Sequence, residues 1–142
     1  MIRTGTTCFH DMYFFPDATA EMVNKTGMRA CIGNPILKFP TGYANNEDDY
    51  LNKAETVISK YKDNSRIKFV ISPHAPYTVS DNGFQKVVEF SKKTGVMIHT
   101  HLHETEFEVI NEKRENGGEH VRPVVRLNEM GLLGPNFIVA HM

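Results

Sequence analysis

Short runs of apolar and β-branched residues recur along the chain, separated by longer segments with helical spacing. Runs of this kind, bounded by glycine, proline and polar residues, predict β-strands. The predicted strands are Thr6–Met12, Met28–Ile32, Ile67–Ser72, Val96–Leu102 and Phe137–Ala140. Because parallel neighbours need a long connection, strands that alternate with helices predict right-handed βαβ units and a parallel sheet. The fold class expected is therefore α/β.

Two of the intervening segments have a clear helical pattern. Apolar residues between Tyr50 and Tyr61 recur every three or four positions and make one apolar stripe. A second stripe begins at Phe84, after Ser80 and Asp81, which can accept the first free N–H groups of a helix. Gly95 follows this stripe as the residue that a C-terminal cap prefers, and Gly27 and Gly131 resemble it.

Composition narrows the class of protein. The 142 residues, 40% of them hydrophobic, predict a single domain over residues 1–142. A balance of 16 Lys+Arg against 17 Asp+Glu, without a basic run, gives no reason to expect nucleic acid as a ligand. Two cysteines without a CxxC motif, and no apolar run long enough for a bilayer, favour a cytoplasmic location without membrane insertion.

The loop expected after the second strand, Asn34–Asn46, is rich in asparagine, proline and glycine. Loops at the carboxyl ends of parallel strands commonly bind ligands, so we expect this loop to contact substrate. No glycine-rich phosphate loop follows any of the predicted strands. Cys8, which lies among apolar neighbours, is expected to be a buried structural thiol rather than a nucleophile, since no group nearby in the sequence would activate it.

The densest chemical signal is the run IHTHLHET, which contains His99, His101 and His103. A strand with a period of two places these imidazoles on one face, where they could bind Zn²⁺ or another first-row metal. The alternative is an edge strand with solvated histidines. Glu104 follows directly, and two roles are open for it: a proton carrier at the edge of the sheet, or a cap for a helix that begins near Thr105.

Other histidines follow other predicted strands. His74, held between two prolines, comes after the third strand, and His141 comes after the last. Carboxyl ends of parallel strands share one edge, so His74, His101 and His141 should meet there. His10 and Asp11, at the end of the first strand, could also approach this edge, whereas His120 lies in a polar stretch and is expected to be exposed. Each of these residues alone could equally be structural.

These segments together resemble the amidohydrolase superfamily, in the branch of 5-methylthioadenosine/S-adenosylhomocysteine deaminases, guanine deaminases and chlorohydrolases. The resemblance covers essentially the whole chain and rests on GTTCFHDMYFFPDATA, SPHAPYTVSD, IHTHLHETEFEV and GLLGPNFIVAHM, in this order. It implies a (β/α)₈ barrel that holds Zn²⁺ or a similar ion, activates water and expels ammonia from an adenine-type ring. A small-molecule purine nucleoside is the partner implied.

The resemblance also assigns roles to particular residues. His101 is similar to the metal ligand of the fifth strand, and Glu104 to the acid/base that protonates the ring nitrogen beside the attacked carbon. His74 resembles a substrate-binding histidine of the fourth strand. His141 resembles the sixth-strand histidine that orients the attacking hydroxide. His99 and His103 have no ligand role in this comparison.

Two family features are missing. The family has an HxH pair at the end of its first strand and an aspartate at the end of its eighth, and the chain has neither in the corresponding place. The predicted strands thus correspond to about the second to sixth of eight, and the chain is shorter than the roughly 250 residues usual for the fold. We therefore expect a partial TIM-type barrel that is inactive by itself.

Three hypotheses follow. The first is an adenine-type deaminase completed by further strands. The second is a related amidohydrolase with another substrate, such as guanine or a chlorinated ring. The third is a non-catalytic α/β fragment that associates with itself through its open sheet edges, as a homo-oligomer.

Overall fold

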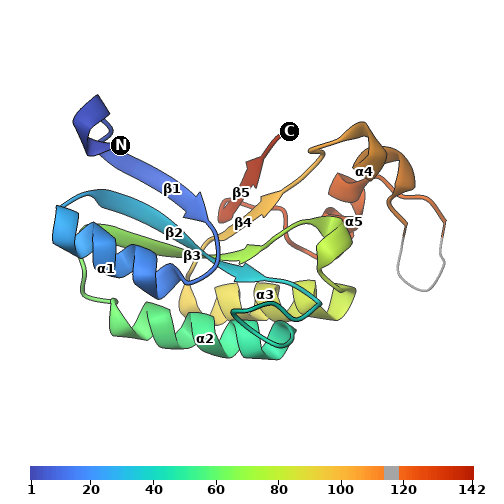
Figure 1. The fold of residues 1–142 in the computed structure, drawn as a ribbon. Helices are drawn as coiled ribbons and strands as arrows, with labels where there is room; N and C mark the ends of the chain where they lie inside the picture. Colours follow the sequence, from blue (N-terminus) through green and yellow to red (C-terminus); the bar gives the residue numbers. More distant parts are fainter. Residues whose placement is uncertain (114–118) are drawn as a thin grey trace.

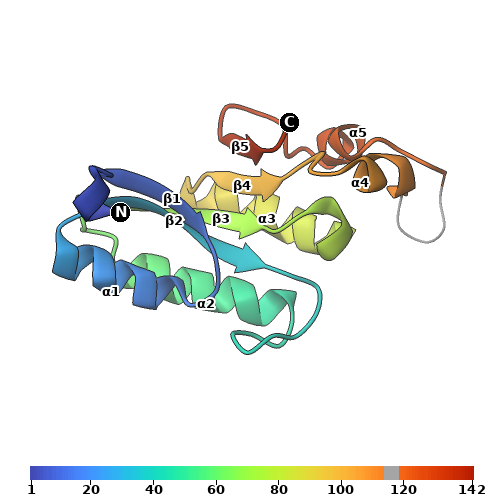
Figure 2. The ribbon, with the colours of Figure 1, turned by 45° about the horizontal axis from the view of Figure 1, so that its top comes forward.

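The structure is a computed structural model and describes residues 1–113 and 119–142. Its centre is a sheet of parallel strands in the order β1-β2-β3-β4-β5, which is also their order along the chain. The strands are β1 (Cys8–Met12), β2 (Arg29–Ile36), β3 (Ile67–Pro73), β4 (Ile98–His101) and β5 (Phe137–Ala140). The sheet curls into part of a barrel, as Figures 1 and 2 show. The predicted α/β class and partial TIM-type barrel are confirmed.

Three long helices connect the first four strands and cover one face of the sheet (Figures 1 and 2). They are α1 (Pro16–Thr26), α2 (Glu47–Lys60) and α3 (Asp81–Thr94). The two expected helices, α2 and α3, begin at side-chain caps: Asn46 accepts the N–H of Asp49, and Ser80 accepts that of Gly83. α3 ends at Gly95 with φ of 74°, a left-handed conformation that costs glycine little.

Short elements complete the described fold, and those after β3 stand beyond the carboxyl ends of β3 and β4 (Figure 2). They are η1 (Ile2–Thr4) before the sheet, η2 (Pro76–Thr78) after β3, and α4 (Glu106–Asn111) and α5 (Pro123–Glu129) between β4 and β5. Among residues 1–113 and 119–142, no helix is long and apolar enough to cross a membrane. The sequence predicted a helix that begins near Thr105 and helix stops at Gly27 and Gly131. These correspond to the start of α4 and to the ends of α1 and α5, although no apolar stripe marked these three helices.

The apolar core lies between the sheet and the helices. Its largest fully buried side chains include Tyr50 of α2, Phe84 of α3 and Ile71 of β3. A smaller cluster under α1 contains Val23 and Ile32. Burial of these residues supplies the main favourable free energy of folding, and it also fixes where the strands end.

Two expectations need correction. β2 continues to Ile36, so the loop after it begins three residues later than the predicted start at Asn34. The reason is that residues 34–36 still pair with β3, where Asn34 is buried and donates an Nδ2–H bond to Val70 O at 3.2 Å. Cys8 is exposed and Cys31 half-buried, and both are free thiols, so Cys8 is not the buried thiol that its apolar neighbours suggested.

Candidate active site

His74 comes directly after β3, at the carboxyl edge of the sheet. Its backbone N–H donates to Ile36 O at 3.1 Å, which ties it to the end of the neighbouring strand. The ring Nδ1 lies 2.9 Å from Thr78 Oγ1, and the same hydroxyl oxygen accepts the Ala75 N–H at 3.1 Å. The turn between the two prolines therefore fixes both the backbone and the ring of this histidine.

His101 ends β4 and is bonded to the backbone of His74 twice. Its backbone N–H and its ring Nδ1 each lie 3.0 Å from His74 O. A carbonyl only accepts hydrogen bonds, so Nδ1 must carry the proton and Nε2 of the neutral ring is left with a free lone pair. A backbone carbonyl on one ring nitrogen is the usual support of a histidine that binds a metal through the other.

His141 and Glu104 complete the group. His141 follows β5 with φ of 74°, and its ring stacks on that of His101, with centroids 5.2 Å apart and planes at 27°. Its Nε2 lies 4.0 Å from Glu104 Oε1. The His74 and His101 rings are 5.1 Å apart. The structure thus brings His74, His101, Glu104 and His141 together at one edge of the sheet, as the strand ends predicted.

Burial makes part of this edge a poor place for positive charge. Burial is the largest cause of the lowered pKa of His74. The nearby His101 lowers this pKa further, and Glu104 opposes the shift. His74 is therefore mainly neutral at pH 7. Burial, together with His10 and His101, lowers the pKa of His99 to about 4. Burial raises the pKa of Tyr77, and the carboxylates of Glu104 and Glu108 raise it further. A side-chain hydrogen bond between Tyr77 and Glu104 acts in the same direction.

The prediction that three imidazoles share one face of β4 is wrong for His103. The strand ends at His101, and His103 adopts φ of 59°, which turns its ring away. Its Nε2 accepts the Val124 N–H of α5 at 3.4 Å. His99 and His101 do share a face, with ring centroids 6.0 Å apart, and His99 also meets His10 of β1 at 4.2 Å. His10 thus approaches the same inner face, whereas His120 is exposed, as expected.

The cap expected from Glu104 is provided by another residue. α4 is capped by Thr105, whose hydroxyl accepts the Glu108 N–H at 3.2 Å. The carboxylate of Glu104 is therefore not used by the cap: its Oε1 lies 4.0 Å from His141 Nε2, and it also hydrogen-bonds the side chain of Tyr77.

His101 has the donor chemistry and the second hydrogen bond that a zinc ligand needs. Within the described ranges, however, no three His, Cys, Asp or Glu side chains gather closely enough to hold an ion. The residues present fit part of a metal site, to which His101 could supply one ligand.

The sequence reading missed two buried charged residues behind this edge. Glu108 of α4 is 4% exposed and Arg126 of α5 is 5% exposed. The spacing Thr105-x-x-Glu108 is a capping-box signature, and could have drawn attention to Glu108. Arg126 has no comparable local signal, since its partners lie far away in the sequence.

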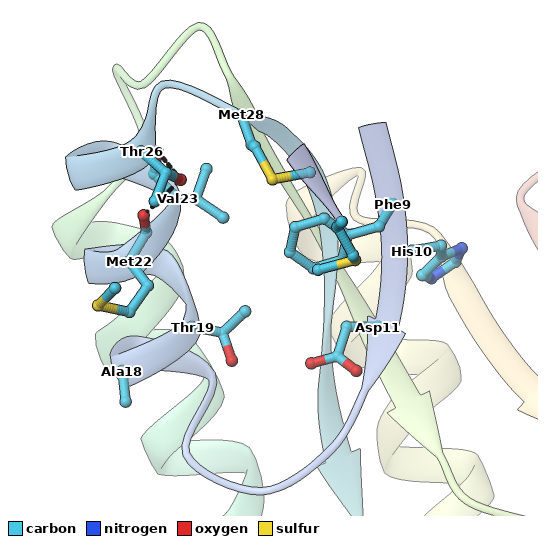
Figure 3. Close-up of a pocket in the computed structure, with 10 residues that line it drawn as sticks. Phe9, His10, Asp11, Ala18, Thr19, Met22, Val23, Thr26 and Met28 are labelled. Atoms are coloured by element: carbon cyan, nitrogen blue, oxygen red, sulfur yellow. Dashed lines mark hydrogen bonds between the residues drawn. The ribbon is translucent and has the colours of Figure 1, made fainter. Parts of the chain in front are cut away.

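A cavity of about 600 Å³ lies away from these residues, between β1 and α1. Figure 3 shows Phe9 projecting into it from β1, Met28 from just before β2 and Thr19 from α1, while the ring of His10 points to the other side of β1. Its lining is mainly apolar, and none of His74, His101, Glu104 and His141 contributes to it. We therefore look for the chemistry at the sheet edge that carries these four residues rather than in this cavity.

Comparison with known proteins shows the family of the chain. The model of the amidohydrolase family matches residues 1–142. The chain is 40% identical over 142 residues to a 5-methylthioadenosine/S-adenosylhomocysteine deaminase of Saccharophagus degradans, and 43% identical over 141 residues to one of Thermodesulfovibrio yellowstonii. It covers 100% and 99% of itself in these matches and 31% of each relative, so it spans about a third of their length.

A solved structure gives the same result in three dimensions. An adenosine deaminase of Xanthomonas campestris with bound zinc superposes with a TM-score of 0.92 at 36% identity, over 99% of this chain and 31% of that one. The matched part of that deaminase therefore follows the same path as β1 to β5 and their connections. With the family model matching its whole length, the chain belongs to the amidohydrolase family.

Proposed function

We propose that residues 1–142 form the central part of a metal-dependent amidohydrolase that removes the exocyclic amine from an adenine-type ring, such as that of 5-methylthioadenosine or S-adenosylhomocysteine. The observation that carries the proposal is the meeting of His74, His101, Glu104 and His141 at one edge of a parallel sheet. The deaminase names of two relatives at 40% and 43% identity support the substrate class.

Each residue of the edge has a chemical role in this proposal. A bound divalent ion such as Zn²⁺ lowers the pKa of water and so supplies a nucleophile near neutral pH. His101 would hold such an ion through Nε2, because its Nδ1 donates to His74 O. Glu104 protonates the ring nitrogen beside the attacked carbon, and His141 stabilises the charge that develops there. His74, mainly neutral, hydrogen-bonds the substrate.

The ligand in this proposal is a small purine nucleoside, and the cellular location is the cytoplasm. The free thiols of Cys8 and Cys31 support a reducing compartment.

The test compares the chain alone with a barrel-completed chain. We define the latter as residues 1–142 joined to the flanking segments of the Thermodesulfovibrio yellowstonii relative, in place of the region that they match. Zinc content and ammonia release are measured with 5-methylthioadenosine, S-adenosylhomocysteine and guanine as substrates. We expect about one zinc per chain and deamination of the adenine-type substrates by the barrel-completed chain only.

Other outcomes change the proposal in defined ways. Deamination of guanine alone would replace the substrate class. Activity of the short chain alone would contradict the need for further strands. If neither chain releases ammonia and the short chain runs as a defined oligomer on sizing chromatography, the non-catalytic alternative replaces the deaminase.

A further inference from the structure

Glu104 lies on an irregular turn between β4 and α4. The residue before it, His103, has φ of 59°. A non-glycine residue in this left-handed region costs about 1–2 kcal/mol, so the turn needs support from its surroundings. The position of the Glu104 carboxylate relative to His141 depends on this turn.

The support comes from the side chain of Glu108. Its Oε1 accepts the His103 N–H at 3.0 Å, and its Oε2 accepts the Glu104 N–H at 2.9 Å. Both oxygens of one carboxylate therefore hold two consecutive backbone groups. The side chain is itself oriented from behind, since the Glu108 N–H donates to the Thr105 hydroxyl at 3.2 Å. Hydrogen bonds to a buried carboxylate are among the stronger ones in proteins.

The other end of α4 is tied to the segment that contains His74. Glu112, just after the helix, pairs with Arg126 of α5, and both side chains are buried. Arg126 also donates to Pro76 O at 2.9 Å, two residues after His74, and to Asp81 at the start of α3. α4 thus connects the Glu104 turn at one end with the His74 segment at the other.

We propose that Glu108 is a positioning residue for the reaction: it holds the backbone of Glu104 so that the Glu104 carboxylate stays aligned with His141 and the substrate ring. The proposal rests on the proposed function for its catalytic consequence, but the hold on the turn is a separate physical claim. The hold of Glu108 on Glu104 runs through the backbone, because its two oxygens accept the N–H groups of His103 and Glu104.

The main variant is Glu108→Gln in the barrel-completed chain. The amide has one accepting oxygen, and its NH₂ group would face a backbone N–H, so one of the two bonds is lost. We expect kcat to fall about 100-fold with KM changed less than about threefold, since a small misplacement of a reacting group has this effect. Deuterium exchange over residues 102–106 should become about tenfold faster.

The matched control is Glu47→Gln. Glu47 is likewise a carboxylate that accepts a backbone N–H, from Ser80 at 2.8 Å, and it also accepts the Ser80 hydroxyl at 2.7 Å. This variant should lower the melting temperature without the loss of kcat or the faster exchange at residues 102–106. Thr105→Val, which removes only the hydroxyl behind Glu108, should lower kcat in the same direction by a smaller factor.

The outcomes separate this proposal from the deaminase assignment. Unchanged exchange over residues 102–106 in folded Glu108→Gln overturns the hold on the turn, whether or not the enzyme is active. Unchanged kcat, or an equal loss of kcat in Glu47→Gln, overturns the positioning role. If the unmodified barrel-completed chain releases no ammonia, the proposed function fails, and the exchange experiment still decides whether Glu108 holds the turn.

Discussion

The β1 side and the β3–β5 side of the molecule, at opposite ends of the strand order, differ in how firmly their side chains are held. At the β3–β5 side, buried Glu108 and Arg126 tie the turns that contain the candidate site to neighbouring helices. At the β1 side, α1 leaves a cavity of about 600 Å³, and Tyr13 and Phe15 are 68% and 51% exposed. Buried polar contacts therefore hold the β3–β5 side, where the candidate site lies, whereas the β1 side is held mainly by apolar packing.

The largest effect that separates the two sides should be on activity. Glu104→Gln removes the proposed proton carrier, so kcat of the barrel-completed chain should fall about 10²–10⁴-fold. Tyr13→Ala, at the exposed end of β1, should leave kcat within about threefold, because surface changes are usually nearly neutral. Steady-state ammonia release measures both. A loss of less than tenfold in Glu104→Gln would contradict the role given to this carboxylate.

The next effect concerns ion pairs. Arg126→Leu leaves Glu112 buried without this cation, and burial already raises the pKa of that carboxyl group. The free energy of unfolding should fall by about 3–5 kcal/mol. The ion pair of Lys25 with Glu21 on α1 is exposed, so Lys25→Ala should give no measurable change. Urea unfolding of the chain compares the two, and equal losses would remove the contrast between the sides.

Larger side chains should have a smaller effect on stability, and the sign of this effect should differ between the two sides. Ala54 of α2 is fully buried in the main core, so Ala54→Leu should overpack it and cost about 1–3 kcal/mol. Thr19 of α1 lines the cavity, and Thr19→Leu should fill part of it and stabilise by about 0.5–2 kcal/mol. Thermal unfolding of both variants is the measurement. Destabilisation by Thr19→Leu would mean that the β1 side has no usable space.

The last pair of substitutions should show no difference in stability between the two sides. Gly27 ends α1 and Gly95 ends α3, with φ of 73° and 74°, and an added Cβ would meet no atom within 4 Å at either position. Gly27→Ala and Gly95→Ala should therefore each cost about 1 kcal/mol through the backbone alone. Urea unfolding would show unequal costs if the two sides differed in backbone strain as well as in packing.

Much of the architecture could be read from local pattern. The five predicted strands all exist, and the caps at Ser80 and Gly95 are confirmed. The meeting of His74, His101 and His141 followed from their places after strands of one parallel sheet. The individual roles of these residues and of Glu104 stay predictions. The rule of alternation failed at His103, because the strand ended two residues before it.

By itself, the sequence determined the order of strands and helices and the edge at which the histidines emerge, because periodicity, caps and strand ends depend on residues close together in the chain. Only the tertiary structure decided which polar groups brace that edge. Arg126 reaches Asp81 and Pro76 across 45 and 50 positions, and His10 meets His99 across the sheet. Such contacts form only after the sheet has curled and the core has fixed its helices, so no local pattern encodes them.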